Sequence, residues 1–262
     1  MILDVAATPT YAYTGSRPLD TALRTIVFVH GAANDHSVWA LQSRYFAHHG
    51  FNVLAVDLPG HGRSGGEALA SVKAIADWIP ALMDAAGGGA AALVGHSLGS
   101  LAVLECAARH ASRVTKLVLI GPAAPMPVAE VLLDAARRND HVAYELITGW
   151  SFSAQAQLGG NTVPGVWLTG NALRLTERNR PGVLYADLLA CDAYAAGIDS
   201  AGKVQCPALV IVGARDIMAP AKNAQGLVAA LPDARSITLP DCGHALMAEK
   251  PDAVLDALHA FL

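Results

Sequence analysis

Residues 95–99 of this 262-residue chain read Gly95-His96-Ser97-Leu98-Gly99. The pentapeptide follows an apolar run at residues 91–94 and precedes a helix-like pattern at residues 98–109. A G-x-S-x-G match alone is common by chance, but its position at a strand-to-helix turn is specific. The glycines permit the sharp turn that exposes a serine at a helix N-terminus, where backbone N–H groups and the helix dipole favour negative charge. We therefore interpret Ser97 as a nucleophile rather than as a buried or capping serine.

Short apolar runs rich in Val, Ile and Leu recur on both sides of this pentapeptide. They occupy residues 25–29, 53–56, 91–94, 116–120, 208–212 and 235–239. Continuous apolar runs of this length are typical of parallel strands that are buried on both faces. Helix-like segments separate these runs, so the sequence predicts βαβ units and an α/β fold with a mostly parallel sheet covered on both sides.

Two of the helix-like segments have clear boundaries. Residues 71–86 carry their apolar side chains on one helical face, with Ser71 as a fair N-cap and Gly87 as a stop signal. Pro80 lies inside this pattern, where an interior proline costs about 3 kcal/mol or kinks the helix. We therefore expect a bend or an early end there. Residues 251–262 begin with a proline suited to the first turn of a helix and again form one apolar face.

Residues 121–207 depart from the alternation of strand-like and helix-like segments, because they contain no convincing central strand. A structureless loop of that length is unusual in a compact domain. Helix-like pieces occupy residues 128–139, 141–149, 170–179 and 183–195. We interpret the interval as a helical insertion over one edge of the sheet. Its aromatic side chains either line an apolar pocket or only hold the insertion together, and the sequence leaves both readings open for Tyr144, Trp150, Phe152, Trp167, Tyr185 and Tyr194.

A serine hydroxyl needs a base to take its proton near neutral pH. The segment Asp241-Cys242-Gly243-His244 follows the last strand-like run and precedes the last helix, so it places a loop histidine at the carboxyl end of the sheet. In this architecture the base comes last along the chain, and we assign that role to His244. His30 and His96 flank glycines in motifs, and structural or pocket-lining roles suit them better.

The third member of such a triad is an acid that accepts the other imidazole N–H. The segment Gly213-Ala214-Arg215-Asp216 directly follows the strand-like run at residues 208–212. Asp216 therefore lies between serine and histidine in chain order, and we favour it. Asp241 is the rival, but three residues from His244 on the same loop it is poorly placed to aim back at the ring.

Acyl transfer also needs donors for the tetrahedral oxyanion, commonly two backbone N–H groups. One should belong to Leu98, directly after the nucleophile. The other should come from the loop after the first strong strand, Val29-His30-Gly31-Ala32-Ala33-Asn34-Asp35, where we choose Ala32. Its side chain is no objection, because the backbone N–H is the donor.

These residues together resemble the α/β-hydrolase superfamily over nearly the whole chain. Five features match in the family's usual order: His30-Gly31, Asp57-Leu58-Pro59-Gly60-His61-Gly62-Arg63-Ser64, the Gly95-to-Gly99 elbow, Gly213 to Asp216, and Gly243-His244. The resemblance implies an α/β-hydrolase fold with an eight-stranded, mostly parallel sheet. It also implies a core of residues 1–121 and 207–262, with a helical cap of residues 122–206 inserted after the sixth strand.

The resemblance also narrows the chemistry. Haloalkane dehalogenases and epoxide hydrolases of this superfamily use an aspartate nucleophile, where this chain has Ser97. Hydrolases that split carbon–carbon bonds often carry a tryptophan after the catalytic histidine, where this chain has Ala245, so that substrate class is disfavoured without being excluded. The resemblance favours a serine esterase working through an acyl-enzyme. Two alternatives stay open: the same triad used for lyase chemistry or cofactor-free oxygenation, and a receptor-like protein that holds a ligand under the cap.

The substrate pocket is the least readable part of the sequence. As its lining we predict the motif histidines His30 and His96 with Tyr144, Trp150 and Trp167. In the insertion, Arg174, Arg178 and Arg180 either contact an anionic substrate group or form a solvated helix face. The sequence favours the solvated face for each of them.

Composition limits the remaining possibilities. Net charge is −4 with no run of like charges, which argues against a nucleic-acid or anionic-membrane surface. The four cysteines lie far apart and form no CxxC pair, so they predict neither a metal site nor a disulfide framework. We expect no cofactor, a small-molecule acyl substrate, a monomer or homodimer, and a cytoplasmic protein, since neither a signal peptide nor a membrane span is evident.

Overall fold

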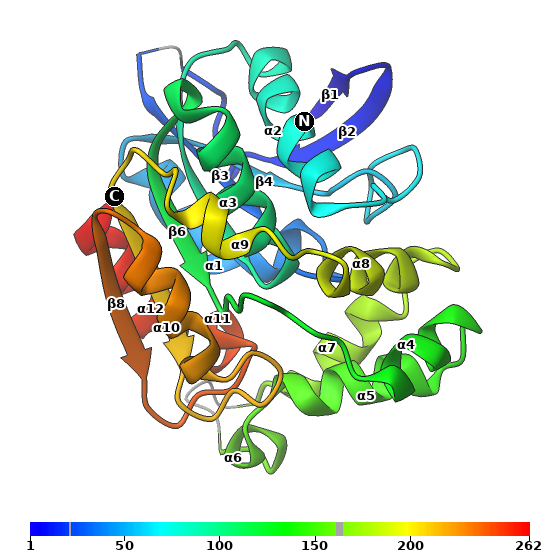
Figure 1. The fold of residues 1–262 in the computed structure, drawn as a ribbon. Coiled ribbons are helices and arrows are strands. Elements are labelled where there is room, and N and C mark those ends of the chain that lie inside the picture. Colours follow the sequence, from blue (N-terminus) through cyan, green and yellow to red (C-terminus); the bar gives the residue numbers. More distant parts are fainter. Residues whose placement is uncertain (21, 161–164) are drawn as a thin grey trace.

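One sheet runs through the protein in this computed structural model, which describes residues 1–20, 22–160 and 165–262 (Figure 1). Its strands lie in the order β1-β2-β4-β3-β5-β6-β7-β8. β1 and β2 pair antiparallel, β2 pairs antiparallel with β4, and all the other pairs are parallel. Their bounds are β1 Ile2–Val5, β2 Thr8–Tyr13, β3 Arg24–Val29, β4 Phe51–Val56, β5 Ala91–His96, β6 Val114–Ile120, β7 Ala208–Gly213 and β8 Ala234–Leu239. The predicted fold class is confirmed, and β1 and β2 are strands that the apolar runs did not reveal.

Apolar side chains of successive residues pack on opposite faces of this sheet. On one face Val27 and Val29 join a cluster with helices α2 (Val72–Ala85), α3 (Leu98–Arg109), α9 (Gly197–Ala201) and α10 (Ala221–Ala230). On the other face Ile26 and Phe28 pack with α1 (Ala40–His48), α11 (Leu246–Glu249) and α12 (Pro251–Phe261). Both faces are therefore covered, which explains why the strands are apolar throughout rather than alternating.

Helix α2 excludes one of the two outcomes expected at Pro80, the early end. It continues through Pro80 to Ala85 instead of ending there. Pro80 is itself buried, on a helix whose apolar face contacts the sheet and α3. Tertiary burial of that face outweighs the hydrogen bond that the proline ring removes from the helix.

Between β6 and β7 the described residues form helices and no strand. These are α4 (Glu130–Arg137), α5 (Val142–Ser151), α6 (Ala154–Gln157), α7 (Leu168–Thr176), α8 (Val183–Asp192) and α9. We call residues 122–206 the cap segment; α4, α5 and α7 stand beyond the sheet in Figure 1. Helices α4, α5 and α8 enclose an apolar cluster that also holds Ala32 and Ala33 from the loop after β3. The cap segment therefore packs directly on a loop of the core.

Two properties of the described residues bear on the chemistry available. No helix among them is long and apolar enough to cross a membrane. Cys106, Cys191 and Cys242 are buried and Cys206 is half-buried, all as free thiols. Burial raises the pKa of Cys106 and Cys242 to about 12 and also raises the pKa of Cys191 and Cys206. These thiols stay protonated near neutral pH and are poor nucleophiles.

Candidate active site

Ser97 lies at the turn between β5 and α3, with φ of 52° and ψ of −118°. A positive φ is uncommon for a residue with a side chain and marks a strained, over-determined turn. The Ser97 N–H donates to Ile120 O on the neighbouring strand at 2.9 Å, which holds the turn against the sheet. At Gly99 a Cβ would overlap the carbonyl oxygens of Val29 and His30, so only glycine fits where α3 passes the end of β3.

His244 and Asp216 meet through a direct hydrogen bond. His244 Nδ1 lies 2.7 Å from Asp216 Oδ2, and both side chains are buried. The second carboxylate oxygen of Asp216 accepts the N–H groups of Met218 at 2.9 Å and Ala219 at 2.8 Å, which fixes the direction of the carboxylate. The rival Asp241 instead has an exposed side chain, 3.7 Å from the Arg215 guanidinium. The structure therefore brings together the pair that the chain order favoured.

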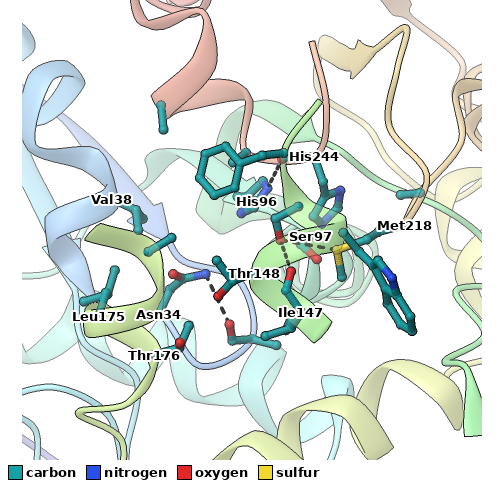
Figure 2. Close-up of a pocket in the computed structure, with 18 of the residues that line it drawn as sticks. Asn34, Val38, His96, Ser97, Ile147, Thr148, Leu175, Thr176, Met218 and His244 are labelled. Atoms are coloured by element: carbon teal, nitrogen blue, oxygen red, sulfur yellow. Dashed lines mark hydrogen bonds between the residues drawn. The ribbon is translucent and has the colours of Figure 1, made fainter. Parts of the chain in front are cut away.

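Ser97 and His244 line the same cavity (Figure 2). Among the described residues no direct hydrogen bond joins the Ser97 hydroxyl to the His244 ring. Such bonds are often loose without substrate and tighten when substrate binds. Ser97 therefore opens into the same cavity that the imidazole of the His244–Asp216 pair lines.

Two backbone N–H groups near Ser97 have no hydrogen-bond partner among the described residues. They belong to Leu98, the first residue of α3, and to Ala32, in the loop after β3. The neighbouring glycine brings that loop close to Ser97, because a Cβ on Gly31 would lie 3.1 Å from Ser97 Cβ. Free N–H groups beside a nucleophile suit an oxyanion that forms there.

His96 precedes Ser97 and contacts the backbone of His244. Its Nε2 lies 2.8 Å from the His244 carbonyl oxygen, so this nitrogen carries the proton and donates. Burial, with His244 nearby, lowers the pKa of His96 to about 3, and the ring is neutral. Its buried Nδ1 has no partner among the described residues. His96 thus anchors the backbone of His244 without titrating near neutral pH.

The cavity has a volume of about 690 Å³, within the usual range for small-molecule sites. Its walls are mostly apolar and come from both the core and the cap segment, with Met126, Ile147, Trp150, Phe152, Leu188 and Met218 among the larger side chains. Arg174 and Arg178 reach its mouth, and both are solvent-exposed. Arg180 lies elsewhere and donates to the carbonyl oxygens of Ser64 and Gly66.

Of the five residues predicted for the pocket, His96 and Trp150 line it and three do not. His30 lies buried beneath the loop after β3, with its ring bonded to Gly31 O and Leu58 N–H. Tyr144 packs within the apolar cluster of the cap segment. Trp167 is 72% exposed at the start of α7. A helical pattern shows that an aromatic side chain lies on a helix of the insertion. It does not show how that helix is rotated about its axis, and so not whether the side chain faces the pocket.

Sequence reasoning missed two buried carboxylates near the site. Glu249 accepts the Gly243 N–H at 2.9 Å and the Ser153 hydroxyl at 2.6 Å, so it ties the loop of His244 to the cap segment. Burial raises the pKa of Glu249 above its ordinary value. Asp187 in α8 bonds to His61 and to Ala33 N–H. A single acid inside the apolar run at residues 183–191 was the available signal, since unpaired acids are rarely buried.

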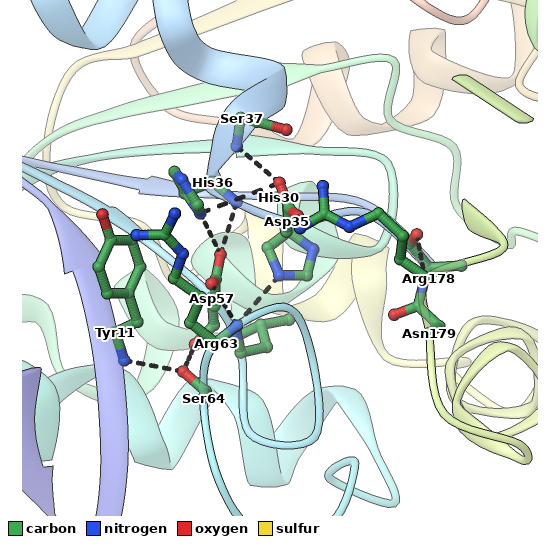
Figure 3. Close-up of polar contacts among 12 residues, drawn as sticks. Tyr11, His30, Asp35, His36, Ser37, Asp57, Arg63, Ser64, Arg178 and Asn179 are labelled. Carbon is green, nitrogen blue, oxygen red and sulfur yellow. Dashed lines mark hydrogen bonds and ion pairs between the residues drawn. The ribbon is translucent and has the colours of Figure 1, made fainter. Parts of the chain in front are cut away.

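Asp35, His36 and Asp57 form a cluster that has the residue types of a metal site (Figure 3). Their carboxylates already have partners. Asp57 accepts His36 N–H at 2.7 Å, His36 Nδ1 at 2.7 Å and Arg63 N–H at 2.8 Å, while Asp35 caps the short helix that begins at His36. These bonds brace the turn after β4, and the cluster needs no cation to be satisfied.

Comparison with known proteins adds to this geometry. A family model described as alpha/beta hydrolase fold matches residues 24–251. The chain is 33% identical over 231 residues to a pimeloyl-[acyl-carrier protein] methyl ester esterase of Chromobacterium violaceum, covering 84% of this chain and 87% of that one. It is 32% identical to the protein of the same name from Aromatoleum aromaticum, covering 87% of this chain and 93% of that one. An enol-lactonase structure from Burkholderia xenovorans LB400 superposes with a TM-score of 0.88 at 24% identity, covering 100% of this chain and 99% of that one, which shows a shared fold.

Proposed function

Because the chain is a hydrolase and belongs to the α/β-hydrolase family, we propose that it is a serine esterase acting through an acyl-enzyme on Ser97. The observation that carries this proposal is the 2.7 Å bond between His244 and Asp216, in a cavity that also exposes a strained serine. A serine paired with an imidazole that a buried acid orients is the arrangement of serine hydrolases on many folds.

The proposed reaction begins when Ser97 Oγ attacks the ester carbonyl carbon and His244 Nε2 takes the hydroxyl proton. Asp216 accepts from Nδ1–H and stabilises the imidazolium that forms. The oxyanion of the tetrahedral intermediate is stabilised by the N–H groups of Ala32 and Leu98. When it collapses, the carbon–oxygen bond to the alcohol breaks and the His244 proton passes to the departing alkoxide. Water then attacks the acyl-enzyme by the same route and releases the acid.

The cavity supports a substrate larger than acetate. Its volume and apolar walls suit an acyl chain of medium length, with water excluded as the chain fills it. Both curated relatives compared above carry names for methyl ester hydrolysis, and this supports a carboxylic ester as the scissile group. We propose a small-molecule acyl ester as substrate, with no cofactor.

The test is steady-state turnover of p-nitrophenyl esters from acetate to octanoate, together with labelling by a fluorophosphonate. We expect Ser97→Ala to lose at least about 10⁴-fold in kcat and all labelling, while Ser236→Ala, at an exposed serine of β8, changes neither. Labelling of Ser97 without sustained turnover would redirect the search to non-hydrolytic chemistry or ligand binding. Full turnover by Ser97→Ala would overturn the proposal.

A further inference from the structure

A buried acid and a buried imidazole outside the proposed triad join the cap segment to the core. The acid is Asp187 of α8, and it contacts His61 and the loop that carries Ala32. Asp187 and His61 are each 1% exposed, and Asp187 Oδ2 lies 2.8 Å from His61 Nε2. The same oxygen accepts the Ala33 N–H at 2.8 Å. One carboxylate oxygen of the cap segment therefore binds two separate loops of the core.

The environment of His61 shows that it is charged. Its Nδ1 lies 3.0 Å from Pro59 O and its Nε2 faces Asp187, so both ring nitrogens meet acceptors. Only the doubly protonated imidazolium donates to both. Burial opposes this charge, but the Asp187 carboxylate outweighs it, and the pKa of His61 is raised. Asp187 and His61 thus form a buried ion pair, which stabilises an arrangement only when both partners are present.

His30 lies against this pair and stays neutral. Its Nδ1–H donates to Gly31 O at 2.8 Å, and its Nε2 accepts the Leu58 N–H at 3.1 Å (Figure 3). Its ring centre is 4.9 Å from that of His61. Burial, together with the nearby His61, lowers the pKa of His30 to about 4. The positive charge therefore remains on His61, directly against the carboxylate of the cap segment.

These contacts control the peptides on either side of Ala32. The Gly31 carbonyl belongs to the same peptide as the Ala32 N–H, and it accepts from His30 and from Asn34 N–H. The next peptide is held at both ends, because its carbonyl accepts from Asn34 Nδ2 at 3.2 Å and its N–H, that of Ala33, donates to Asp187. A trans peptide is planar, so bonds on one edge set the direction of the group on the other.

The cap segment binds the second polar group of Ala33 as well. Asn179, in the turn after α7, donates from Nδ2 to Ala33 O at 2.6 Å. Ala33 itself has φ of 53°, a conformation that costs energy for a residue with a side chain and persists only where its surroundings impose it. Side chains from the cap segment therefore impose the strained conformation directly after Ala32.

We propose that Asp187, paired with His61, is a positioning residue that aims the Ala32 N–H at the oxyanion site and does so only while α8 is docked. The inference rests on the proposed esterase function. On this view the cap segment closes the cavity and also completes the oxyanion site. Closing and stabilising the transition state are then one event, so a loose cap segment gives a poor catalyst even with Ser97, His244 and Asp216 in place.

The test compares Asp187→Ala with Asp187→Asn, whose amide oxygen still accepts from Ala33 without the charge. Asp192→Asn, on the same helix with an exposed bond to Val128 N–H, is the matched control. We expect Asp187→Ala to lower kcat about 10²-fold with KM changed by less than about threefold. The Ki of a trifluoromethyl ketone, which forms an oxyanion on Ser97, should rise about as much. Asp187→Asn should lose less than about tenfold, and Asp192→Asn should match the wild type.

Asp187→Ala leaves the charged His61 buried without its partner, and Asn179→Ala is the second variant in case that protein does not fold. It removes the hydrogen bond to Ala33 O and leaves the Asp187–His61 pair intact. We expect its kcat to fall with KM unchanged, and its circular dichroism to stay native. Hydrogen exchange at Ala33 N–H should quicken in Asp187→Ala whether or not the protein turns over esters. An inactive wild type would overturn the proposed function, whereas slow Ala33 exchange in Asp187→Ala would overturn this inference alone. Unchanged kcat and Ki in folded Asp187→Ala and Asn179→Ala would also overturn it.

Discussion

The nucleophile turn and the loop after β3 meet at the same edge of the sheet, but different forces hold them. The turn at Ser97 is held by backbone groups of the core, through its N–H bond to Ile120 and the close approach of Gly99 to β3. The loop at Ala33 is held by side chains from the cap segment, Asp187 and Asn179. Ser97 is thus positioned by backbone contacts within the core, and one proposed oxyanion donor by side chains of the cap segment that packs onto the core.

This difference separates two ways of losing activity. A substitution that distorts the turn displaces Ser97, the proposed nucleophile, so nearly all activity should be lost. Damage at the loop leaves serine, base and acid intact, so activity should fall by the contribution of one donor, about 10²–10³-fold. Variants at the two regions therefore test whether the core and the cap segment contribute to catalysis independently.

The largest effect is expected from Gly99→Ala in the turn. The added Cβ would overlap the carbonyl oxygens at the end of β3, which are backbone atoms with little room to move. We expect kcat/KM to fall by at least about 10⁴-fold, as for removal of the serine itself, because the overlap displaces Ser97 from its place. Gly149→Ala in α5 is the control, because a Cβ there meets nothing within 4 Å and a helical alanine stabilises by about 0.5–1 kcal/mol. Equal activity of the two variants would mean that the turn tolerates displacement.

Next in size is the loss of the acid that orients the base. Asp216→Asn keeps the shape of the side chain but favours the wrong imidazole tautomer, and kcat should fall about 10³–10⁴-fold. Asp241→Asn, at an exposed side chain near Arg215, should stay within about twofold. Steady-state kinetics on one ester measures both. A larger loss in Asp241→Asn would show that the proposed acid is wrong.

The buried pair at the loop predicts a dependence of stability on pH. Because the folded state raises the pKa of His61, the pair contributes its full stability below the ordinary histidine pKa of about 6.5 and loses it as pH rises through the folded value. Asp57 and His30 also face His61, but both residues are present in the wild type and in Asp187→Asn, so their effects cancel in the comparison of the two proteins. The Tm advantage of the wild type over Asp187→Asn should therefore shrink as the pH rises above about 6.5. A Tm difference independent of pH would show that His61 is not charged.

The smallest effect is expected at Thr148, in the cavity wall formed by α5. Its hydroxyl is buried and has no partner among the described residues. Burying it therefore costs the free energy of desolvation, and no hydrogen bond offsets that cost. Thr148→Val has the same shape and should raise kcat/KM for plain alkyl esters by about threefold. For an ester with a hydroxyl or oxo group on the acyl chain, a fall in kcat/KM would show that Thr148 binds that oxygen. If Thr148→Val and the wild type have the same kcat/KM for the plain ester and also for the substituted ester, Thr148 does not contribute to substrate recognition.

Much of the core was predictable because its signals are local. Six apolar runs marked six of the strands, and the elbow with its flanking glycines marked Ser97. The family and the fold class predicted from these motifs are confirmed by the family match over residues 24–251. Helix α2 shows where local reasoning fails, since Pro80 breaks isolated helices but is tolerated in a helix packed against a sheet.

Ser97 was assigned from its motif, whereas His244 and Asp216 were assigned from chain order, because loops that follow parallel strands must gather at one edge of the sheet. The directions of Tyr144 and Trp167, the pairing of Asp187 with His61, and the contact of Asn179 with Ala33 followed from no such rule. They depend on how the helices of the cap segment rotate and settle on the core. That packing is made of contacts between residues far apart along the chain, so no local pattern records it. In this protein a short motif marks the proposed nucleophile, whereas folding of the whole chain determines the surroundings of the proposed oxyanion site.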